Sequence, residues 1–82
     1  MTPEDILAQL KLIMPRASQA KVDWQAVAMD TSIKSLGFDS LSIMDLAYDM
    51  AQHFNVEFDL MNAGPLQTVG DVVQLIHRLQ HP

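Results

Sequence analysis

The chain of 82 residues has room for one domain, residues 1–82, and its apolar fraction of 49% is ample for a folded core and argues against intrinsic disorder. Its net charge of −5 argues against nucleic acid and anionic membranes as partners, and the absence of cysteine excludes disulfides and thiolate metal sites. The start of the chain is acidic where a signal peptide would be basic, and no apolar run approaches the roughly 18 residues of a membrane span, so we expect a cytoplasmic protein without membrane insertion.

The first predicted element is a helix that begins at Pro3. Thr2 is a suitable N-cap, and Pro3 suits the first helical position. The two acids that follow, Glu4 and Asp5, face the positive end of the helix dipole. Apolar residues at spacings of three and four predict one buried face, made of Ile6, Leu7, Leu10, Ile13 and Met14. Pro15 predicts that this helix ends near Met14.

Residues 15–38 show no sustained hydrophobic period and predict a long loop with short helical turns near residues 24–27. A loop of this length in a small domain is often functional. Its apolar residues are expected to hold the loop against the helices. Trp24 is interpreted as such a packing residue rather than as a platform for a ligand.

The second predicted helix spans Ser40–Phe54, with Asp39 as its N-cap and Asn55 at its end. Helical periodicity assigns one face to the core: Ile43, Ala47, Met50, Ala51 and Phe54. The polar side consists of Ser42, Asp45, Asp49, Gln52 and His53. The apolar surface extends beyond the core face to a flank formed by Leu41, Met44 and Tyr48. Either the loop or a short third helix covers this flank, or it stays open for transient partners, and the pattern alone leaves both alternatives open.

The C-terminal part of the chain predicts one short helix and one longer helix. Residues 60–63 can form a single helical turn before Gly64 and Pro65 break it. Thr68 and Asp71 resemble a capping box at the start of a last helix, which ends near Gln80. The apolar stripe of that helix comprises Val69, Val72, Val73, Ile76 and Leu79. The predicted fold is therefore all-α, a small four-helix bundle of three longer helices and one short helix, with a long loop between the first and second helices.

Residues 36–42, LGFDSLS, place Ser40 after a glycine and an acid at the start of the second helix. A capping role is open to Ser40, although Asp39 already suits that position. A nucleophilic role would need a base, and neither a histidine tied to Ser40 nor the Gly-x-Ser-x-Gly pattern is present. A phosphate ester on Ser40 would sit at the positive end of the helix, where free backbone N–H groups favour an anion, and Gly37 permits the tight turn before it. These residues favour an attachment site.

Residues 36–41, LGFDSL, resemble the attachment motif of acyl carrier proteins, and the likeness extends without a gap from residue 33 to residue 79. Other matching positions are Leu46, Phe54, Val56, Ala63, Thr68, Val69 and Asp71. The resemblance implies that Ser40 carries 4′-phosphopantetheine, loaded from coenzyme A by a phosphopantetheinyl transferase, with Asp39 assisting around a magnesium ion. The thiol of the arm would hold an acyl group as a thioester for fatty-acid, polyketide or related lipid biosynthesis. The chain itself would be a monomeric carrier with no catalytic residue.

The second helix then acquires two further roles. A docking surface for acyl-loading, condensing and tailoring enzymes with basic surfaces would consist of Leu41, Met44, Asp45, Tyr48 and Asp49. By resemblance, an acyl pocket between the helices would be lined by Ile43, Leu46, Ala47, Met50, Met61 and Ala63. The methionines and alanines among these residues favour a cleft that can expand.

The chain departs from carriers of primary fatty-acid synthesis, which favours a specialised carrier. Ser42 stands where those carriers usually have an acid, and late acids of their second helix are replaced by Ala51, Gln52 and His53. His77 and His81 lie four residues apart, but without a third ligand we expect solvated histidines and no metal. Two other classes stay open. They are an unmodified helical adaptor that binds partners through the second helix, and a small serine hydrolase.

Overall fold

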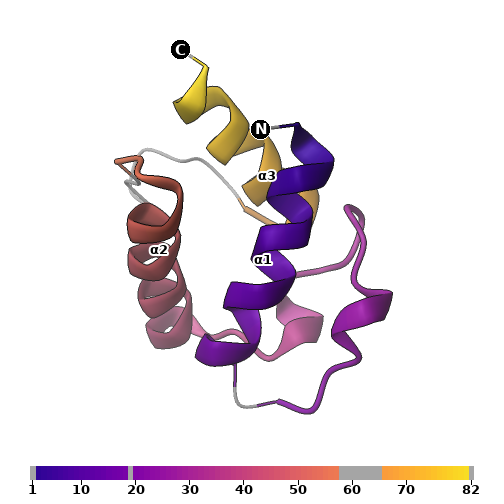
Figure 1. The fold of residues 1–82 in the computed structure, drawn as a ribbon. Coiled ribbons are helices and arrows are strands. Elements are labelled where there is room, and N and C mark those ends of the chain that lie inside the picture. Colours follow the sequence, from indigo (N-terminus) through magenta and orange to yellow (C-terminus); the bar gives the residue numbers. More distant parts are fainter. Residues whose placement is uncertain (1, 19, 58–65, 82) are drawn as a thin grey trace.

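The computed structural model describes residues 2–18, 20–57 and 66–81, and the regular elements in these ranges are helical (Figure 1). The α-helices are α1 (Pro3–Ala17), α2 (Ser40–Phe54) and α3 (Val69–Gln80), and the loop between α1 and α2 contains the short 3-10 helices η1 (Trp24–Ala26) and η2 (Lys34–Leu36). The all-α prediction is confirmed. The short helix predicted at residues 60–63, and with it the count of four helices, lies outside the described residues. None of the helices in the described ranges has the length and apolar content needed to cross a membrane.

Side-chain caps determine where each α-helix begins. Thr2, Asp39 and Thr68 are the N-caps of α1, α2 and α3, and each closes a capping box with the residue three positions later. Thr68 Oγ1 accepts from the N–H of Asp71 at 3.2 Å, and Asp71 Oδ2 accepts from the N–H of Thr68 at 3.1 Å. Such bonds satisfy N–H groups that have no partner within the helix. Helix α2 ends at its C-cap Asn55, which is in the left-handed region with φ 54°. The predicted bounds of α2 and α3 are confirmed.

The prediction that α1 ends near Met14 is wrong, because α1 continues through Pro15 to Ala17. Pro15 removes one N–H donor and crowds the preceding turn, but the helix continues for only two residues beyond it. The N–H of Ser18 still donates to the Met14 carbonyl at 3.0 Å and closes that turn. Met14 stays fully buried, and Ala17 packs against the core.

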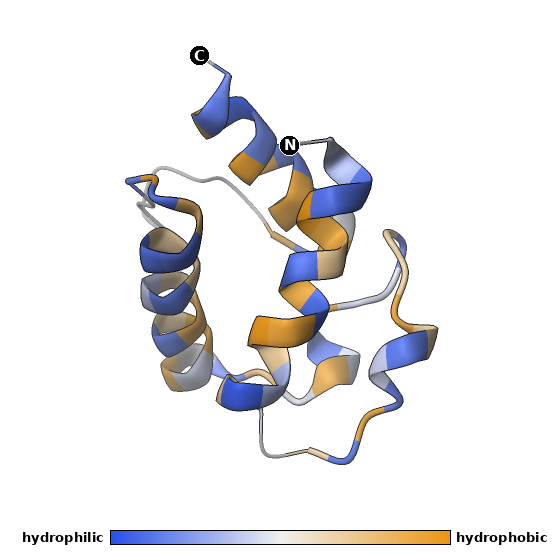
Figure 2. Cartoon of the chain, viewed as in Figure 1, coloured by the Kyte–Doolittle hydropathy of each residue, from blue (hydrophilic) through white to orange (hydrophobic). Residues whose placement is uncertain are grey.

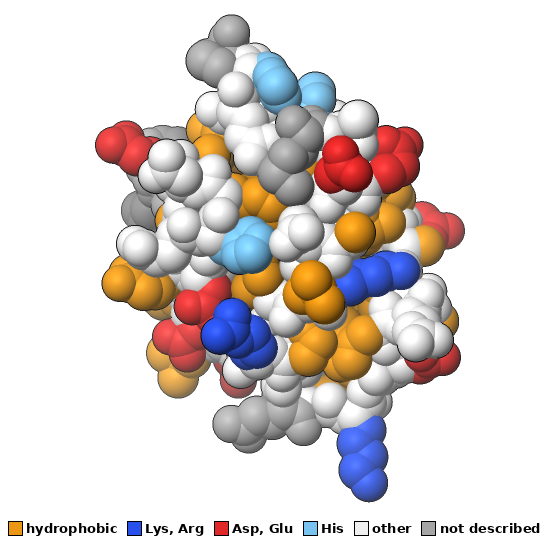
Figure 3. Space-filling model, in the orientation of Figure 1, with side chains coloured by type: hydrophobic (Ala, Val, Ile, Leu, Met, Phe, Trp, Pro, Cys, Tyr) orange, Lys and Arg blue, Asp and Glu red, His pale blue; other side chains and the backbone are white. Residues whose placement is uncertain are grey.

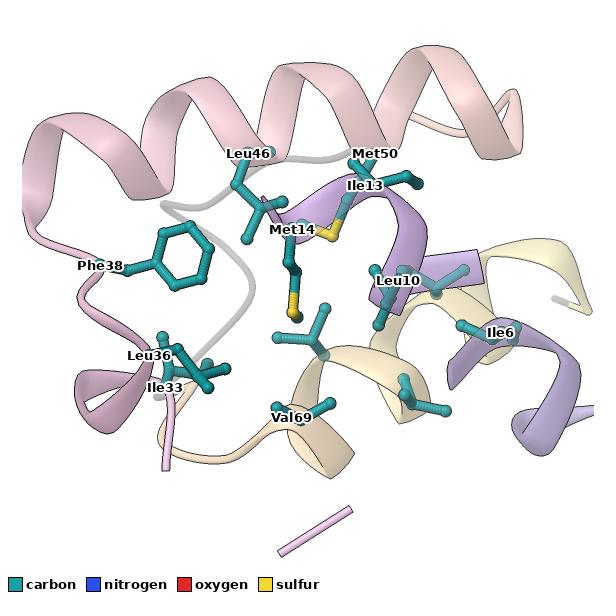
Figure 4. Close-up of a cluster of buried hydrophobic side chains, with 14 of the residues drawn as sticks. Ile6, Leu10, Ile13, Met14, Ile33, Leu36, Phe38, Leu46, Met50 and Val69 are labelled. Carbon is teal, nitrogen blue, oxygen red and sulfur yellow. The ribbon is translucent and has the colours of Figure 1, made fainter. Parts of the chain in front are cut away.

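The α-helices bury their apolar faces in one core (Figures 2 and 4). Helix α1 packs against both α2 and α3 and contributes Ile6, Leu10, Ile13 and Met14. The other buried residues are Leu46, Ala47, Met50 and Phe54 of α2, Val69, Val72, Val73 and Ile76 of α3, and Val27, Ile33, Leu36 and Phe38 of the loop. Four side chains that we assigned to the core are less buried than predicted. Leu7, Ile43 and Ala51 are half-buried, and Leu79 is 37% exposed because the last turn of α3 extends past the start of α1 (Figure 1).

The long loop between α1 and α2 is held across the start of α3. The N–H groups of Val69 and Gly70 donate to the carbonyls of Thr31 and Met29 at 2.9 and 2.7 Å. A Cβ on Gly70 would lie 2.8 Å from the Met29 oxygen, so this close approach requires glycine. The helical turn predicted near residues 24–27 is η1, where Trp24 packs partly buried against the core as expected. The second turn, η2, was not predicted.

Candidate functional site

Ser40 is the first residue of α2, and the residues before it bring the chain from the core to the surface. Helix η2 ends at Gly37, whose φ of 84° is in the left-handed region that glycine adopts readily. The next side chain, Phe38, is buried, whereas Asp39 is exposed. The start of α2 therefore lies at the surface on a turn that is anchored in the core by Phe38 (Figure 4).

Asp39 caps α2 through one carboxylate oxygen. Its Oδ1 accepts from the N–H groups of Leu41 at 3.0 Å and Ser42 at 2.8 Å, and from the Ser42 hydroxyl at 2.9 Å. The Ser42 hydroxyl in turn accepts from the N–H of Asp39 at 2.9 Å. The N–H of Ser42, then its hydroxyl, and then the N–H of Leu41 hold the pKa of Asp39 below its usual range. The carboxylate is therefore ionised at neutral pH.

This cap changes two expectations from the sequence. The N–H groups of Leu41 and Ser42 are not free to bind a phosphate, because they already donate to Asp39. An anion at this end of α2 would be stabilised by the helix dipole rather than by those two groups. Ser42 is a member of the capping box. From the sequence we interpreted it only as part of the polar face and as a position where carriers of primary fatty-acid synthesis usually have an acid. The signal was the Asp-x-x-Ser spacing, with serine in place of the usual Glu or Gln.

The apolar flank of α2 is exposed. The side chains of Leu41, Met44 and Tyr48 are 76%, 61% and 68% exposed, so the prediction of an open flank is confirmed. Asp45 beside them is exposed, and Asp49 is half-buried. The space-filling view shows acidic and apolar side chains together over α2 (Figure 3). We call these five residues the α2 surface, and their mixture of apolar and acidic groups is complementary to a partner surface with apolar and basic groups.

Two clefts in the described part of the chain adjoin the start of α2. One has a volume of about 300 Å³ and lies between the end of α1 and the start of α2, lined by Ala17, Gly37, Asp39, Leu41, Ser42 and Asp45. The other has a volume of about 360 Å³ and is lined by Ile33, Lys34, Phe38, Asp39, Ile43 and Leu66. We call the second one the Ile43 cleft. Four of its six lining residues are apolar, and Asp39, which also lines it, directly precedes the first residue of α2.

The Ile43 cleft contains only part of the predicted acyl pocket. Ile43 lines it, whereas Leu46, Ala47 and Met50 are buried in the core (Figure 4). The remaining predicted residues, Met61 and Ala63, lie outside the described residues. Sequence reasoning missed Ile33, Phe38 and Leu66 as cleft residues, because they come from segments without helical periodicity.

The histidines lie away from Ser40. His53 is in the last turn of α2, about 20 Å along the helix from its first residue, and its Nε2 is 2.8 Å from Gln9 Oε1. His77 and His81 are at the end of α3, with ring centroids 4.7 Å apart, and Figure 1 shows this end far from the start of α2. Nowhere in the described residues do three or more metal-ligating side chains gather into a possible metal site. No histidine is therefore placed to act as a base for Ser40, and the geometry does not support a serine hydrolase.

Comparisons with known proteins point to one family. A family model described as a phosphopantetheine attachment site matches residues 17–76. An acyl carrier protein of Exiguobacterium sibiricum is 35% identical over 93% of this chain and 95% of its own length. Nodulation protein F of Rhizobium leguminosarum bv. viciae is 30% identical over 96% of this chain and 90% of its own length. A non-reducing polyketide synthase of Aspergillus fumigatus is 35% identical over 87% of this chain, which spans only 4% of the synthase.

Proposed function

Because the chain belongs to the acyl carrier protein family, whose cofactor is phosphopantetheine, we propose that Ser40 is the residue to which 4′-phosphopantetheine is attached. The chain is a carrier of acyl groups in fatty-acid or polyketide biosynthesis and not an enzyme. One observation carries the assignment to Ser40. Within the matched residues 17–76, this serine is the first residue of α2, directly after the Gly37 turn and the Asp39 cap, and its neighbours Asp39 and Leu41 are exposed.

The residues around Ser40 suit an arm that is linked through a phosphodiester. Asp39 and Leu41 on either side are exposed, so a group attached here has access to solvent. The positive end of the α2 dipole stabilises the phosphodiester charge. When bound, the arm supplies the thiol that a chain without cysteine lacks, and this thiol holds acyl groups as thioesters. In the loading step the Ser40 oxygen would bond to the phosphorus that carries the pantetheine part of coenzyme A. The bond from this phosphorus to the bridging pyrophosphate oxygen would break, 3′,5′-ADP would leave, and the hydroxyl proton would pass to the transferase.

The α2 surface is the proposed docking surface for the transferase and for acyl-loading, condensing and tailoring enzymes. The exposed apolar side chains of Leu41, Met44 and Tyr48 provide contact area, and the carboxylates of Asp45 and Asp49 are complementary to basic groups on those enzymes. Its position on the helix that begins at Ser40 would bring a bound enzyme close to the arm.

The Ile43 cleft is the proposed shelter for part of the acyl chain. It is lined by the side chains of Ile33, Phe38, Ile43 and Leu66 and adjoins Asp39, so a chain on the arm of Ser40 can reach it. Burial of apolar methylenes there would be favourable. Helix α2 has fewer acidic residues than the carriers of primary fatty-acid synthesis, which supports a specialised carrier. Ser42 stands where those carriers usually have an acid, and here it takes part in the helix cap. The fourth short helix, the monomeric state and the cytoplasmic location stay predictions.

The assignment of Ser40 is tested by loading the protein in vitro. Incubation with coenzyme A, magnesium and a broad-specificity phosphopantetheinyl transferase should add one phosphopantetheinyl group, measured by intact-protein mass spectrometry. Ser40→Ala should gain no mass, whereas Ser42→Ala, which removes the neighbouring hydroxyl, should still be loaded once. Modification of Ser40→Ala would contradict the proposal by placing the attachment at another residue. An unchanged mass of the natural protein would also contradict it and would favour an unmodified adaptor.

A further inference from the structure

The hydroxyl of Ser18 connects the two ends of the long loop between α1 and α2. Ser18 follows α1 as its C-cap and is half-buried. Its Oγ donates to the carbonyl of Leu36 at 2.7 Å and accepts from the N–H of Ala20 at 3.2 Å. One hydroxyl therefore joins the end of α1 to the end of η2, 18 residues later in the chain. We call this pair of hydrogen bonds the Ser18 latch.

The latch holds the segment that determines where α2 begins. Leu36 is buried, and Gly37 follows it in the left-handed region. A Cβ on Gly37 would lie 2.5 Å from Ala20 Cβ and 3.3 Å from Ser18 Oγ, so the turn lies directly against the latch. Only Phe38 and Asp39 separate this turn from Ser40. A shift of the Leu36 carbonyl would therefore be transmitted to the start of α2 over a very short stretch of chain.

The latch also adjoins a cleft that a loading enzyme would meet. Ala17 and Gly37, on either side of the latch, line the cleft of about 300 Å³ together with Asp39, Leu41 and Asp45. These last three residues border Ser40 or belong to the α2 surface. The cleft lies between the end of α1 and the start of α2, and the Ser18 hydroxyl bonds the end of α1 to Leu36, the residue before the Gly37 turn that leads into α2.

We propose that Ser18 is a positioning residue for the loading of Ser40, an inference that rests on the proposed attachment at Ser40. The Ser18 hydroxyl does not touch the reacting atoms. It keeps the Gly37 turn in the arrangement in which the transferase can bind Asp39, Ser40 and the α2 surface together. Without the hydroxyl, the Leu36 carbonyl and the Ala20 N–H lose a partner, and the turn populates other arrangements. A smaller competent fraction raises the apparent KM for the carrier and leaves kcat nearly unchanged.

The test compares loading kinetics of four proteins over a range of apo-carrier concentrations. Ser18→Ala should raise KM for the carrier by up to about fivefold, the upper limit for one lost hydrogen bond, with kcat changed less than twofold. Ser18→Thr keeps the hydroxyl and should restore KM to within about twofold of the natural protein. The matched control is Ser35→Ala. The Ser35 hydroxyl donates to the Ser32 carbonyl at 2.6 Å within the same loop, but this bond joins near neighbours and does not connect the two ends of the loop. The KM of this variant should not change.

Each outcome decides for or against the positioning role. Equal KM values for Ser18→Ala and Ser35→Ala, a change in kcat alone, or no rescue by Ser18→Thr would overturn it. If Ser18→Ala is unfolded by circular dichroism at the assay temperature, Ser18→Cys replaces it, since the thiol is a weaker hydrogen-bonding group of similar shape. A KM for Ser18→Cys equal to that of the natural protein would also overturn the role. If the natural protein itself is not loaded, the attachment at Ser40 is wrong, and this result is distinct from a loaded protein without a Ser18 effect.

Discussion

Two methionines of α2 separate docking from folding, because they have opposite environments on one helix. Met44 is 61% exposed on the α2 surface, whereas Met50 is 1% exposed in the core. Methionine and alanine have similar helix propensities, so replacing either residue with alanine changes the helix itself little. The two substitutions remove the same atoms and differ only in what those atoms contact. They therefore form a matched pair.

The structure predicts different magnitudes for the two substitutions. Truncation of a fully buried methionine removes apolar contacts and leaves a cavity, so Met50→Ala should lower the free energy of unfolding by about 2–5 kcal/mol. That is a large part of the roughly 4–12 kcal/mol expected for a domain of this size. Met44→Ala should change the free energy of unfolding by less than about 0.5 kcal/mol, because its side chain is mostly in water. It should instead lower kcat/KM for loading and for a partner enzyme.

Urea unfolding at low temperature measures the stability difference, and loading kinetics measure the docking effect. A suitable control is Leu12→Ala, since Leu12 is 67% exposed on α1 and does not belong to the α2 surface. Its loading kinetics should equal those of the natural protein. A loss of 2 kcal/mol or more from Met44→Ala would place the flank in the core and refute the reasoning. An equal slowing by Leu12→Ala would mean that any exposed apolar side chain has this effect.

Two further predictions concern the cargo and the pH dependence of folding. Octanoyl loading of the arm should raise the melting temperature above that of the holo form, because each methylene buried in the Ile43 cleft contributes roughly 0.8 kcal/mol. Equal melting temperatures and unchanged NMR shifts at Ile43 and Leu66 would mean that the octanoyl chain stays in solvent. The N–H groups of Gln67 and then Thr68 hold the pKa of Asp71 below its usual range. A lowered folded-state pKa gives stability that is present above about pH 4 and is lost as the pH falls further. In urea unfolding between pH 5 and about pH 2.5, Asp71→Asn should therefore lose less free energy of unfolding than the natural protein. Equal pH dependence of the free energy of unfolding in the two proteins would contradict the assignment.

The bounds of α2 and α3 were predictable from the sequence because they depend on local patterns. The N-caps at Asp39 and Thr68 and the left-handed stop at Asn55 involve residues within four positions of one another. The helical period also separated Met44 and Tyr48 from the core face of α2, although it left open whether another segment covers them. In each case the interacting groups are near neighbours in the sequence.

The remaining features depend on contacts between distant segments. Helix α1 continues past Pro15, and Ala17 beyond it packs against a core to which α2, α3 and the loop also contribute. The lining of the Ile43 cleft combines Ile33 with Leu66, which are 33 positions apart. The Ser18 latch likewise joins positions that no periodicity relates. Such contacts arise only when the helices have packed, so spacing in the sequence gives no signal for them.

Asp39 shows how one residue can serve both folding and the proposed loading reaction. Its Oδ1 takes all of the hydrogen bonds that the described residues give to the carboxylate, two from backbone N–H groups and one from the Ser42 hydroxyl. These bonds hold the pKa of the carboxyl group below its usual range and fix its orientation. An ionised carboxylate held in this way can present one oxygen to a magnesium ion on the transferase without releasing the helix cap. In the proposed loading reaction the capping residue would thus also contact the metal. A change from Asp39 to Asn would affect the two roles differently, since an amide oxygen can still cap α2 but carries no charge for the metal.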